Sequence, residues 1–385
     1  GTGSGTSSDP YLIFNPIQLD QVRNFLGKTG VYFKMMADID LTQFIQDNYP
    51  TQGWLPIGNS SSAFKGQFDG NGKKITNMTI NRPTTDYLGL FGEVNAATIK
   101  NLTIQGEIKG RNHIGGAVGT VKVASTITNV TTYVNISGSS YIGGVAGSAY
   151  LSTISNIKTY LTANGTDHIG GIVGYVRTAT DNYERRTTIT EVEVDVTING
   201  KNNLGGVVGH ISNGGDYGST SINYSIVTCT INGTDFCGGI VGNAVQDDRG
   251  STVIGRNYVG GTIIASNYVG GIGGYIESSS PGKLTDPIIS TNYFVGTLIG
   301  KQYVGGVCGY VLGYANLIRN YSNATITGTT EVGGIVGYLG SKYTKSNVAI
   351  NEFVSGTSNV GRIYGSKVSS ATIGTNGTAE ANKAL

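Results

Sequence analysis

Segments in which β-forming residues alternate with polar residues recur along most of this chain. Residues 99–104, Ile-Lys-Asn-Leu-Thr-Ile, and residues 127–132, Ile-Thr-Asn-Val-Thr-Thr, are two of them. Alternation over about 4 to 8 residues is typical of a strand with one buried face, and these segments lack the helical period of about 3.6 residues. The pattern therefore predicts an all-β fold.

A glycine motif separates the alternating segments. In Tyr141-Ile-Gly-Gly-Val-Ala-Gly147, an aromatic or polar residue is followed by an aliphatic residue, a glycine pair, two small or aliphatic residues and a final glycine. The motif occurs ten times, with imperfect copies at both ends, and its final glycines are Gly92, Gly119, Gly147, Gly174, Gly209, Gly242, Gly274, Gly309, Gly337 and Gly365. Successive final glycines are 27 to 35 residues apart. Periods of about 20 to 50 residues indicate a solenoid, a propeller or another repeat array.

One repeat of this length divides into three short strands and three turns, as in one coil of a parallel β-helix. A propeller blade would need about 40 residues and four strands. We therefore predict a single right-handed parallel β-helix of about ten coils of 27–35 residues, with a less regular β-solenoid as the alternative. Because neighbouring coils lie about 4.8 Å apart, ten coils make a rod about 45 to 50 Å long. Glycine is expected at the corners, where it permits positive φ and close approach of backbones.

A different pattern precedes the repeats. Asn15 as N-cap, Pro16 at the first helical position and Gly27 as the stop predict one short amphipathic helix, and residues 31–41 follow with a strand pattern. An open β-helix end exposes apolar core and unpaired strand edge, so we expect this region to cap the rod. The expected division is a flexible leader at residues 1–8, an N-terminal cap with the first coil at 9–80, the β-helix at 81–367 and a C-terminal cap or tail at 368–385.

An asparagine stands before the second strand segment of most repeats, and Glu191 interrupts the series. The asparagines are Asn101, Asn129, Asn156, Asn223, Asn257, Asn292, Asn320 and Asn347. Asparagines stacked at one corner of successive coils pass hydrogen bonds from amide to amide, as in cross-β ladders. The series therefore predicts a structural ladder.

Composition limits the partners that this chain can have. Glycine makes up 61 of 385 residues, but Pro is only 7 and 38% of residues are apolar, which excludes collagen and disfavours disorder. The net charge is +2, and no basic run is present, so nucleic acid is not an expected partner. No apolar run approaches the roughly 18 to 20 residues of a membrane span, so direct membrane insertion is not expected either.

Few residues of the sequence suggest metal or redox chemistry. Cys229, Cys237 and Cys308 form neither a CxxC pair nor an even set, and the second and third stand where other repeats have Ile or Val, so buried thiols are expected. His113 and His168 occupy the same motif position two coils apart, which is about 9.6 Å and too far to share one zinc. We predict no metal, no cofactor and no catalytic residue from these features.

Four longer repeats are more informative. Their extra residues follow the glycine motif at about 175–189, 210–221, 243–253 and 275–289, and insertions at one place in successive repeats map to one face, often the binding face. We call these insertions the loop ridge. They are rich in charged and aromatic residues, of which the candidate ligand-binding residues are Tyr183, Arg185, Tyr217, Asp247 and Arg249.

Three interpretations of the loop ridge remain open. Its residues are solvated loop side chains, or they form a docking surface for a saccharide or protein, with tyrosines stacking and charges hydrogen-bonding. The third interpretation is a catalytic or calcium site, since carboxylates roughly 5 to 10 Å apart suffice for glycoside hydrolysis.

The residues that open the glycine motifs form a second candidate surface. They are Tyr87, His113, Tyr141, His168, Asn203, Phe236, Tyr268 and Tyr303. Rings stacked on successive coils either stabilise the rod or provide a platform for sugar rings, and stabilisation is the favoured interpretation.

The serial glycine motifs, with Trp54-Leu-Pro-Ile-Gly58 and residues 64–72 (Phe-Lys-Gly-Gln-Phe-Asp-Gly-Asn-Gly) ahead of them, resemble the GLUG-repeat family of bacterial surface proteins. The resemblance covers residues 9–365, and such repeats occur in surface proteins of gut Bacteroidetes and beside the protease domain of IgA-cleaving metallopeptidases. It implies an extracellular, surface-anchored adhesin or scaffold that binds a host or microbial glycan or surface protein. We expect a removed lipoprotein or secretion signal. The family supplies no catalytic residue, and the alternative function is a polysaccharide-degrading lyase or glycoside hydrolase with its site on the loop ridge.

Replacing the five loop-ridge candidates by Ala together should leave the thermal unfolding transition nearly unmoved, because exposed loop residues contribute less than about 0.5 kcal/mol each. Thermal unfolding followed by circular dichroism checks this expectation. A large drop in the transition temperature would show that these side chains belong to the packed structure.

Overall fold

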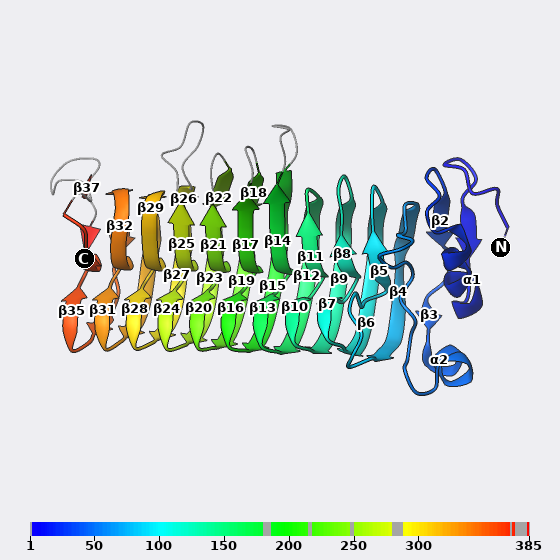
Figure 1. Cartoon of the computed structure of the whole chain (residues 1–385), viewed down its shortest axis with the longest axis horizontal. Coiled ribbons are helices and arrows are strands. Elements are labelled where there is room, and N and C mark those ends of the chain that lie inside the picture. Colours follow the sequence, from blue (N-terminus) through cyan, green and yellow to red (C-terminus); the bar gives the residue numbers. More distant parts are fainter. Residues whose placement is uncertain are drawn as a thin grey trace.

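The computed structural model describes residues 2–179, 186–214, 218–246, 250–278, 288–369, 372–373 and 383–384. The described chain forms a rod of stacked coils, with the N-terminal cap at one end and the last coils at the other (Figure 1). A typical coil contains β7 (Asn112–Gly115), β8 (Val118–Val121) and β9 (Thr126–Ser137), and each strand pairs in parallel with its counterpart on the neighbouring coil. The predicted all-β parallel β-helix of about ten coils is confirmed.

Each coil contributes one short strand that begins at the glycine motif. Within the described residues these strands form a 9-stranded sheet. Besides β7, they are β10 (Ser140–Gly143), β13 (Asp167–Gly170), β16 (Asn202–Gly205), β20 (Asp235–Gly238), β24 (Asn267–Gly270), β28 (Gln302–Gly305), β31 (Thr330–Gly333) and β35 (Ser358–Gly361).

The second strand of each coil begins at the end of the motif. Besides β8, these middle strands are β5 (Phe91–Val94), β11 (Ala146–Tyr150), β14 (Val173–Ala179), β17 (Val208–Gly214), β21 (Val241–Gln246), β25 (Gly273–Ser278), β29 (Cys308–Ile318), β32 (Val336–Lys345) and β36 (Tyr364–Lys367). They belong to the same large sheet as the third set of strands.

The third set comprises the longest strands in the first half of the rod and pairs of shorter strands in the second half. The long strands are β4 (Gln67–Asn81), β6 (Thr98–Lys109), β9, β12 (Thr153–Asn164) and β15 (Arg186–Asn199). The divided strands are β18 (Ser219–Asn223) with β19 (Ile226–Asn232), β22 (Ser251–Gly255) with β23 (Tyr258–Ile264), β26 (Ile288–Ser290) with β27 (Tyr293–Ile299), β30 (Tyr321–Thr327), β33 (Val348–Ala349) and β34 (Phe353–Ser355). Short strands β37 (Thr372–Ile373) and β38 (Lys383–Ala384) pair with β32 and β33.

Aliphatic side chains stacked in register fill the interior of the coils. One such row is Ile114, Ile142, Ile169, Leu204, Cys237, Val269, Val304 and Val332, each buried. Cys237 therefore replaces an aliphatic residue in the core, as predicted. All three cysteines are buried and unpaired, and burial raises the pKa of the Cys229 thiol to about 12.

The glycine pairs serve close packing rather than positive φ. A Cβ atom at Gly144 would lie 2.4 Å from the carbonyl oxygen of Gly171 on the next coil, which is much closer than van der Waals contact. The left-handed backbone lies instead at the residue that opens each motif, where Tyr141 has φ 58° and His168 has φ 57°. The expectation that glycines supply positive φ at these corners is therefore wrong, and bulky side chains occupy the strained position.

Seven of the eight predicted asparagines form two ladders rather than one, whereas Asn223 donates from Nδ2 to Ser221 Oγ of its own strand. In the long strands a single corner residue has positive φ, and Asn129 there is exposed and donates from Nδ2 to Asn101 Oδ1 at 2.7 Å. In the divided strands the corner has two residues, such as Thr291 with φ 59° followed by Asn292. The extra residue turns the asparagine inward, so that Asn292 is buried.

The buried asparagines of the divided strands form what we call the inward ladder, and their side-chain amides are hydrogen-bonded. Its members are Asn257, Asn292, Asn320 and Asn347. Asn292 Nδ2 donates to Asn320 Oδ1 at 3.0 Å and to the carbonyl oxygen of Ile254 at 2.9 Å, while its Oδ1 accepts from Asn257 Nδ2 at 2.9 Å. Asn320 repeats the arrangement with Asn347. A buried amide costs free energy unless it is bonded in this way.

The cap contains one helix more than predicted within the described residues. α1 (Pro16–Asp20) is the expected helix, with Asn15 Oδ1 accepting from the backbone N–H of Gln18 at 3.0 Å, and it continues as the 3-10 helix η1 (Gln21–Phe25). The predicted strand at 31–41 is divided into β2 (Tyr32–Met35) and β3 (Ile39–Asp40), and β1 (Tyr11–Ile13) pairs with β2. The missed helix is α2 (Thr42–Asn48), which starts where Asp40 accepts from the backbone N–H of Thr42 at 2.8 Å.

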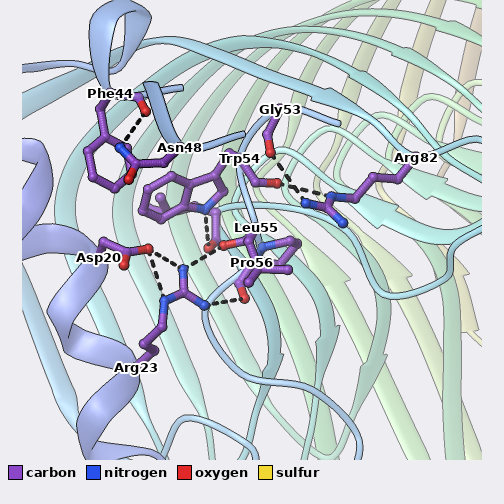
Figure 2. A network of polar contacts seen from close by, with 10 residues as sticks. Asp20, Arg23, Phe44, Asn48, Gly53, Trp54, Leu55, Pro56 and Arg82 are labelled. Carbon is purple, nitrogen blue, oxygen red and sulfur yellow. Dashed lines mark hydrogen bonds and ion pairs between the residues drawn. The ribbon is translucent and has the colours of Figure 1, made fainter. Parts of the chain in front are cut away.

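Two arginines hold the segment that joins the cap to the coils (Figure 2). Arg23 pairs with Asp20 and donates to the carbonyl oxygen of Leu55 at 2.9 Å, while Arg82 donates to the carbonyl oxygen of Gly53 at 3.3 Å. Between them, Trp54 is fully buried and its indole N–H donates to the carbonyl oxygen of Leu90 at 3.1 Å. The cap is thus bound to the first coils by polar contacts as well as by core packing. The described part of the expected leader, residues 2–8, also contacts the cap, since the backbone N–H of Tyr32 donates to the carbonyl oxygen of Gly5 at 2.9 Å.

The two asparagine ladders should differ in their contribution to stability. Asn292→Ala leaves buried donors and acceptors unbonded and should lower the free energy of unfolding by about 1–3 kcal/mol. The matched change Asn129→Ala, on the exposed ladder, should cost less than about 0.5 kcal/mol. Denaturant unfolding followed by circular dichroism measures both, and equal losses would contradict the distinction.

Candidate binding surface

The outward side of the long strands carries a shallow hollow of about 550 Å³, which we call the tyrosine groove. It extends from β4 to β15 across five successive coils, or about 19 Å at the usual strand spacing. Its lining residues are Asn77, Thr79, Gln105, Gly106, Glu107, Tyr133, Val134, Asn135, Tyr160, Leu161, Thr162, Asp195 and Thr197.

Parallel register places the groove side chains in two rows along the rod. One row contains Gln105, Tyr133, Tyr160 and Asp195, and the other contains Glu107, Asn135, Thr162 and Thr197. Both rows lie on the outward face, because residues two apart on one strand point to the same side of the sheet. The rows therefore present amides, hydroxyls and carboxylates at intervals of about one strand spacing.

Tyr133 and Tyr160 form the centre of the groove. Their rings are stacked with centroids 4.6 Å apart and planes 1° from parallel, and the residues are 45% and 37% exposed. The ring faces between them are covered, so each tyrosine offers its edge, its hydroxyl and one outer face. The outer faces lie toward Gln105 and Asp195, their neighbours in register.

The charge of the groove is negative. Among the described residues that line it, Glu107 and Asp195 are charged and none is basic. At its border, Lys158 forms an ion pair with Glu193 at 2.7 Å, and the hydrogen bond that Lys158 donates to Glu193 raises the pKa of the lysine. Lys158, the lysine at the border, is therefore already paired with Glu193.

The same sheet face carries a second tyrosine stack farther along the rod. Tyr258, Tyr293 and Tyr321 lie in register, with centroids 5.3 Å and 4.2 Å apart. These residues are not part of the groove lining. This second stack therefore serves as a control for the groove, because it consists of the same type of side chain on the same sheet face.

The five predicted ligand-binding residues, Tyr183, Arg185, Tyr217, Asp247 and Arg249, lie outside the described residues. The strands that precede them in the sequence are β14, β17 and β21, which pair in succession. Thr178 and Asn213 lie in register near the ends of the first two, both buried, and Asn213 also accepts from Thr220 at 2.7 Å and donates to Thr252 at 2.7 Å. The described ends of these strands therefore lie on adjacent coils and share hydrogen-bonded polar side chains.

The residues that open the motifs form the expected aromatic ladder. Tyr87, His113 and Tyr141 are stacked with centroids 4.8 Å and 4.5 Å apart and planes 12° from parallel. Unlike the two-ring stack in the groove, this ladder continues from coil to coil, so that His113 is covered on both faces by Tyr87 and Tyr141. Rings without a free face favour the stabilising interpretation over a platform for sugar rings.

Sequence analysis missed a second aromatic row beside the first. It consists of Tyr175, His210, Tyr275, Tyr310 and Tyr338, each directly after the final glycine of its motif. Tyr310 stacks on Tyr338 at 4.5 Å and meets Tyr303 of the first row edge-on at 4.9 Å. The signal was the recurrence of aromatics at one motif position, which the alternating pattern alone did not emphasise.

All three histidines belong to these two aromatic rows. His113 and His168 lie on opposite sides of Tyr141, in agreement with their predicted separation. His168 stacks on His210 with centroids 5.1 Å apart, and neither ring nitrogen of His210 has a hydrogen-bond partner among the described residues. Within those residues, no group of three His, Cys, Asp or Glu side chains is placed to hold a metal ion.

No family model matches the chain, so membership of the GLUG-repeat family remains a prediction. A proposed Gly-rich membrane protein of Evansella cellulosilytica is 42% identical over 106 residues, which is 27% of this chain and 12% of that protein. Halomucin of Haloquadratum walsbyi is 30% identical over 156 residues, which is 32% of this chain and 2% of that protein. The chain therefore spans a small part of the length of these curated relatives.

Among solved structures, the chain is similar to a proposed immunoglobulin A1 protease from Bacteroides ovatus. The match has a TM-score of 0.36 and 17% identity, and it covers 100% of this chain and 86% of that one. Among the helices of the described residues, none is long and apolar enough to cross a lipid bilayer.

The stacked, half-buried pair His168 and His210 predicts a pH dependence of stability. Burial, with the charge of His168 as a smaller cause, lowers the pKa of His210 from its usual value of about 6.5 to about 4. The neutral form is favoured in the folded chain, so this contribution is fully present above about pH 6.5 and is lost as the pH falls through about 4. The loss should be on the order of 3 kcal/mol.

His210→Asn provides the matched variant, because Asn243 stands at the same position of the next coil. Denaturant unfolding at pH 7 and pH 4 should show a smaller acid-induced loss in this variant than in the parent protein. An identical loss in both would show that His210 does not contribute.

Proposed function

We propose that this chain is an extracellular, cell-surface binding scaffold that holds a glycan or a surface protein without catalysis. The observation that carries the proposal is the tyrosine groove, an exposed aromatic and polar hollow on a rod whose interior is filled by its own side chains. Aromatic residues joined to convergent polar groups are characteristic of recognition surfaces. Because the core is full, a ligand binds on the outside of the rod.

The surface location is supported by the names of the two curated relatives, one a Gly-rich membrane protein and the other Halomucin. The motif series supports assignment of these repeats to the GLUG-repeat type of bacterial surface protein. The low charge content, 13%, is consistent with a structural repeat. The partner in this proposal is a host or microbial glycan or a surface protein.

The geometry of the groove does not favour a glycoside hydrolase there. Glu107 and Asp195 are its carboxylates, and three coils separate their strands, or about 14 Å along the axis. Paired catalytic carboxylates in glycoside hydrolases lie about 5 to 10 Å apart. The groove carboxylates can therefore accept hydrogen bonds from a ligand, but they cannot act on one glycosidic bond together.

The proposal is tested by presenting the intact protein to a panel of polysaccharides, mucins and cell-surface proteins, with binding and cleavage measured in the same samples. We expect retention on at least one surface and no release of reducing or unsaturated ends. Cleavage of any polysaccharide would replace the scaffold with the enzyme alternative, and failure to bind the entire panel would contradict the proposal.

The five-residue loop-ridge variant distinguishes the two candidate surfaces in the same panel. If the loop ridge is the binding surface, the variant loses affinity while its thermal transition stays unchanged. Unchanged affinity would move the binding surface away from those five residues.

A further inference from the structure

We propose that the tyrosine groove binds an uncharged glycan chain that lies parallel to the rod axis. This inference rests on the proposed binding function and adds the ligand class, its orientation and its site. The groove crosses five coils and so extends about 19 Å along the axis. A hexose unit of an extended chain is about as long as one coil spacing, so the groove holds about four units.

Orientation follows from the rows of side chains. Along the axis, one row offers Gln105, the two tyrosines and Asp195, and each member comes from a separate coil. A ligand that lies along the axis meets a new hydrogen-bonding group at every coil, and its own groups repeat with a similar period. A ligand lying along one strand would meet only the two or three outward side chains of that strand.

The chemistry of the lining favours hydroxyl groups as the ligand's polar atoms. Asn135 and Gln105 both donate and accept, Thr162 does the same through its hydroxyl, and the two carboxylates accept. A sugar hydroxyl can donate to the carboxylates in charge-assisted hydrogen bonds and can accept from the amides. The outer faces and edges of the tyrosines contact the apolar C–H surfaces of sugar rings.

A peptide is a weaker candidate because the groove has no free strand edge. The strands that form its floor, from β6 to β12, are each hydrogen-bonded to a neighbouring coil on both sides. A peptide strand therefore cannot add to the sheet through its backbone, which is the main source of affinity in strand addition. Any peptide would depend on side-chain contacts alone.

The charge of the lining excludes anionic chains. Glu107 and Asp195 repel uronate, sulfate and phosphate groups, and the described lining has no basic side chain to offset them. Like-charge juxtaposition of this kind selects against ligands as effectively as attraction selects for them. The acceptable glycan is therefore neutral.

The test uses the intact chain and isothermal titration with neutral β-linked hexose oligosaccharides of increasing length, and with polygalacturonate as the anionic probe. We expect binding of a neutral series, with affinity that rises up to about four units and then levels off, as the five-coil length requires. No binding of polygalacturonate is expected. Neutral chains with other linkages are included so that linkage preference does not hide a positive result.

Tyr133→Ala combined with Tyr160→Ala should lower affinity at least tenfold, because both central contacts are removed. The matched control is Tyr258→Ala combined with Tyr293→Ala, which removes a similar stack from the same sheet outside the groove. The control should bind like the parent. Circular dichroism of both variants shows whether the coils remain folded, and Asn135→Ala, a milder change in the groove, should lower affinity without affecting the stack.

The outcomes separate this inference from the proposed function. If the parent binds neutral glycans and both double variants bind equally well, the groove is the wrong site although the scaffold function stands. If the parent binds only a protein or only anionic glycans, the neutral-glycan inference fails and the scaffold function stands. If Glu107→Gln with Asp195→Asn gains affinity for polygalacturonate, the exclusion by charge is supported; no gain would contradict it.

Discussion

The close approach of backbones at the glycine corners is the constraint on which the rest of the structure depends. At Gly144 and Gly171, no side chain fits between one coil and the next, since an added Cβ would lie 2.4 Å and 2.1 Å from a neighbouring carbonyl oxygen. The corners therefore stack directly on one another, and every strand that leaves them starts in the same register. Parallel pairing then places equivalent residues about 4.8 Å apart along the whole rod.

Ladders of like side chains follow from this register. The residue that opens each motif is held at positive φ, a backbone conformation that is costly for aromatic residues such as Tyr141. Stacking on the rings of the neighbouring coils offsets part of that cost. Asn292 and its neighbours solve a different problem, because inward amides are tolerable only where the next coil supplies their bonding partners.

The outward positions are free of these demands, and there the chain differs from coil to coil. Gln105, Tyr133, Tyr160 and Asp195 occupy equivalent places on four successive strands, although an amide, two phenols and a carboxylate stand there. The tyrosine groove is such a local departure from repetition. The loop ridge is another, and it starts from different strands, so that a rod of this kind can carry separate surfaces without changing its core.

The sequence by itself determined the fold class, because the period of the glycine motif and the alternation of β-forming residues are local patterns that one coil shape satisfies. It also identified Cys237 as a core residue and Asn15 as a helix cap, since each stood in a pattern that depends only on near neighbours. It did not reveal α2, which begins directly after the strand-patterned residues 31–41, where the Asp40 carboxylate accepts from the backbone N–H of Thr42. Only the tertiary structure decided which outward residues of different coils meet. Tyr133 and Tyr160 are 27 residues apart, and their contact depends on the register between coils, in which a shift of one residue would turn either side chain to the opposite face.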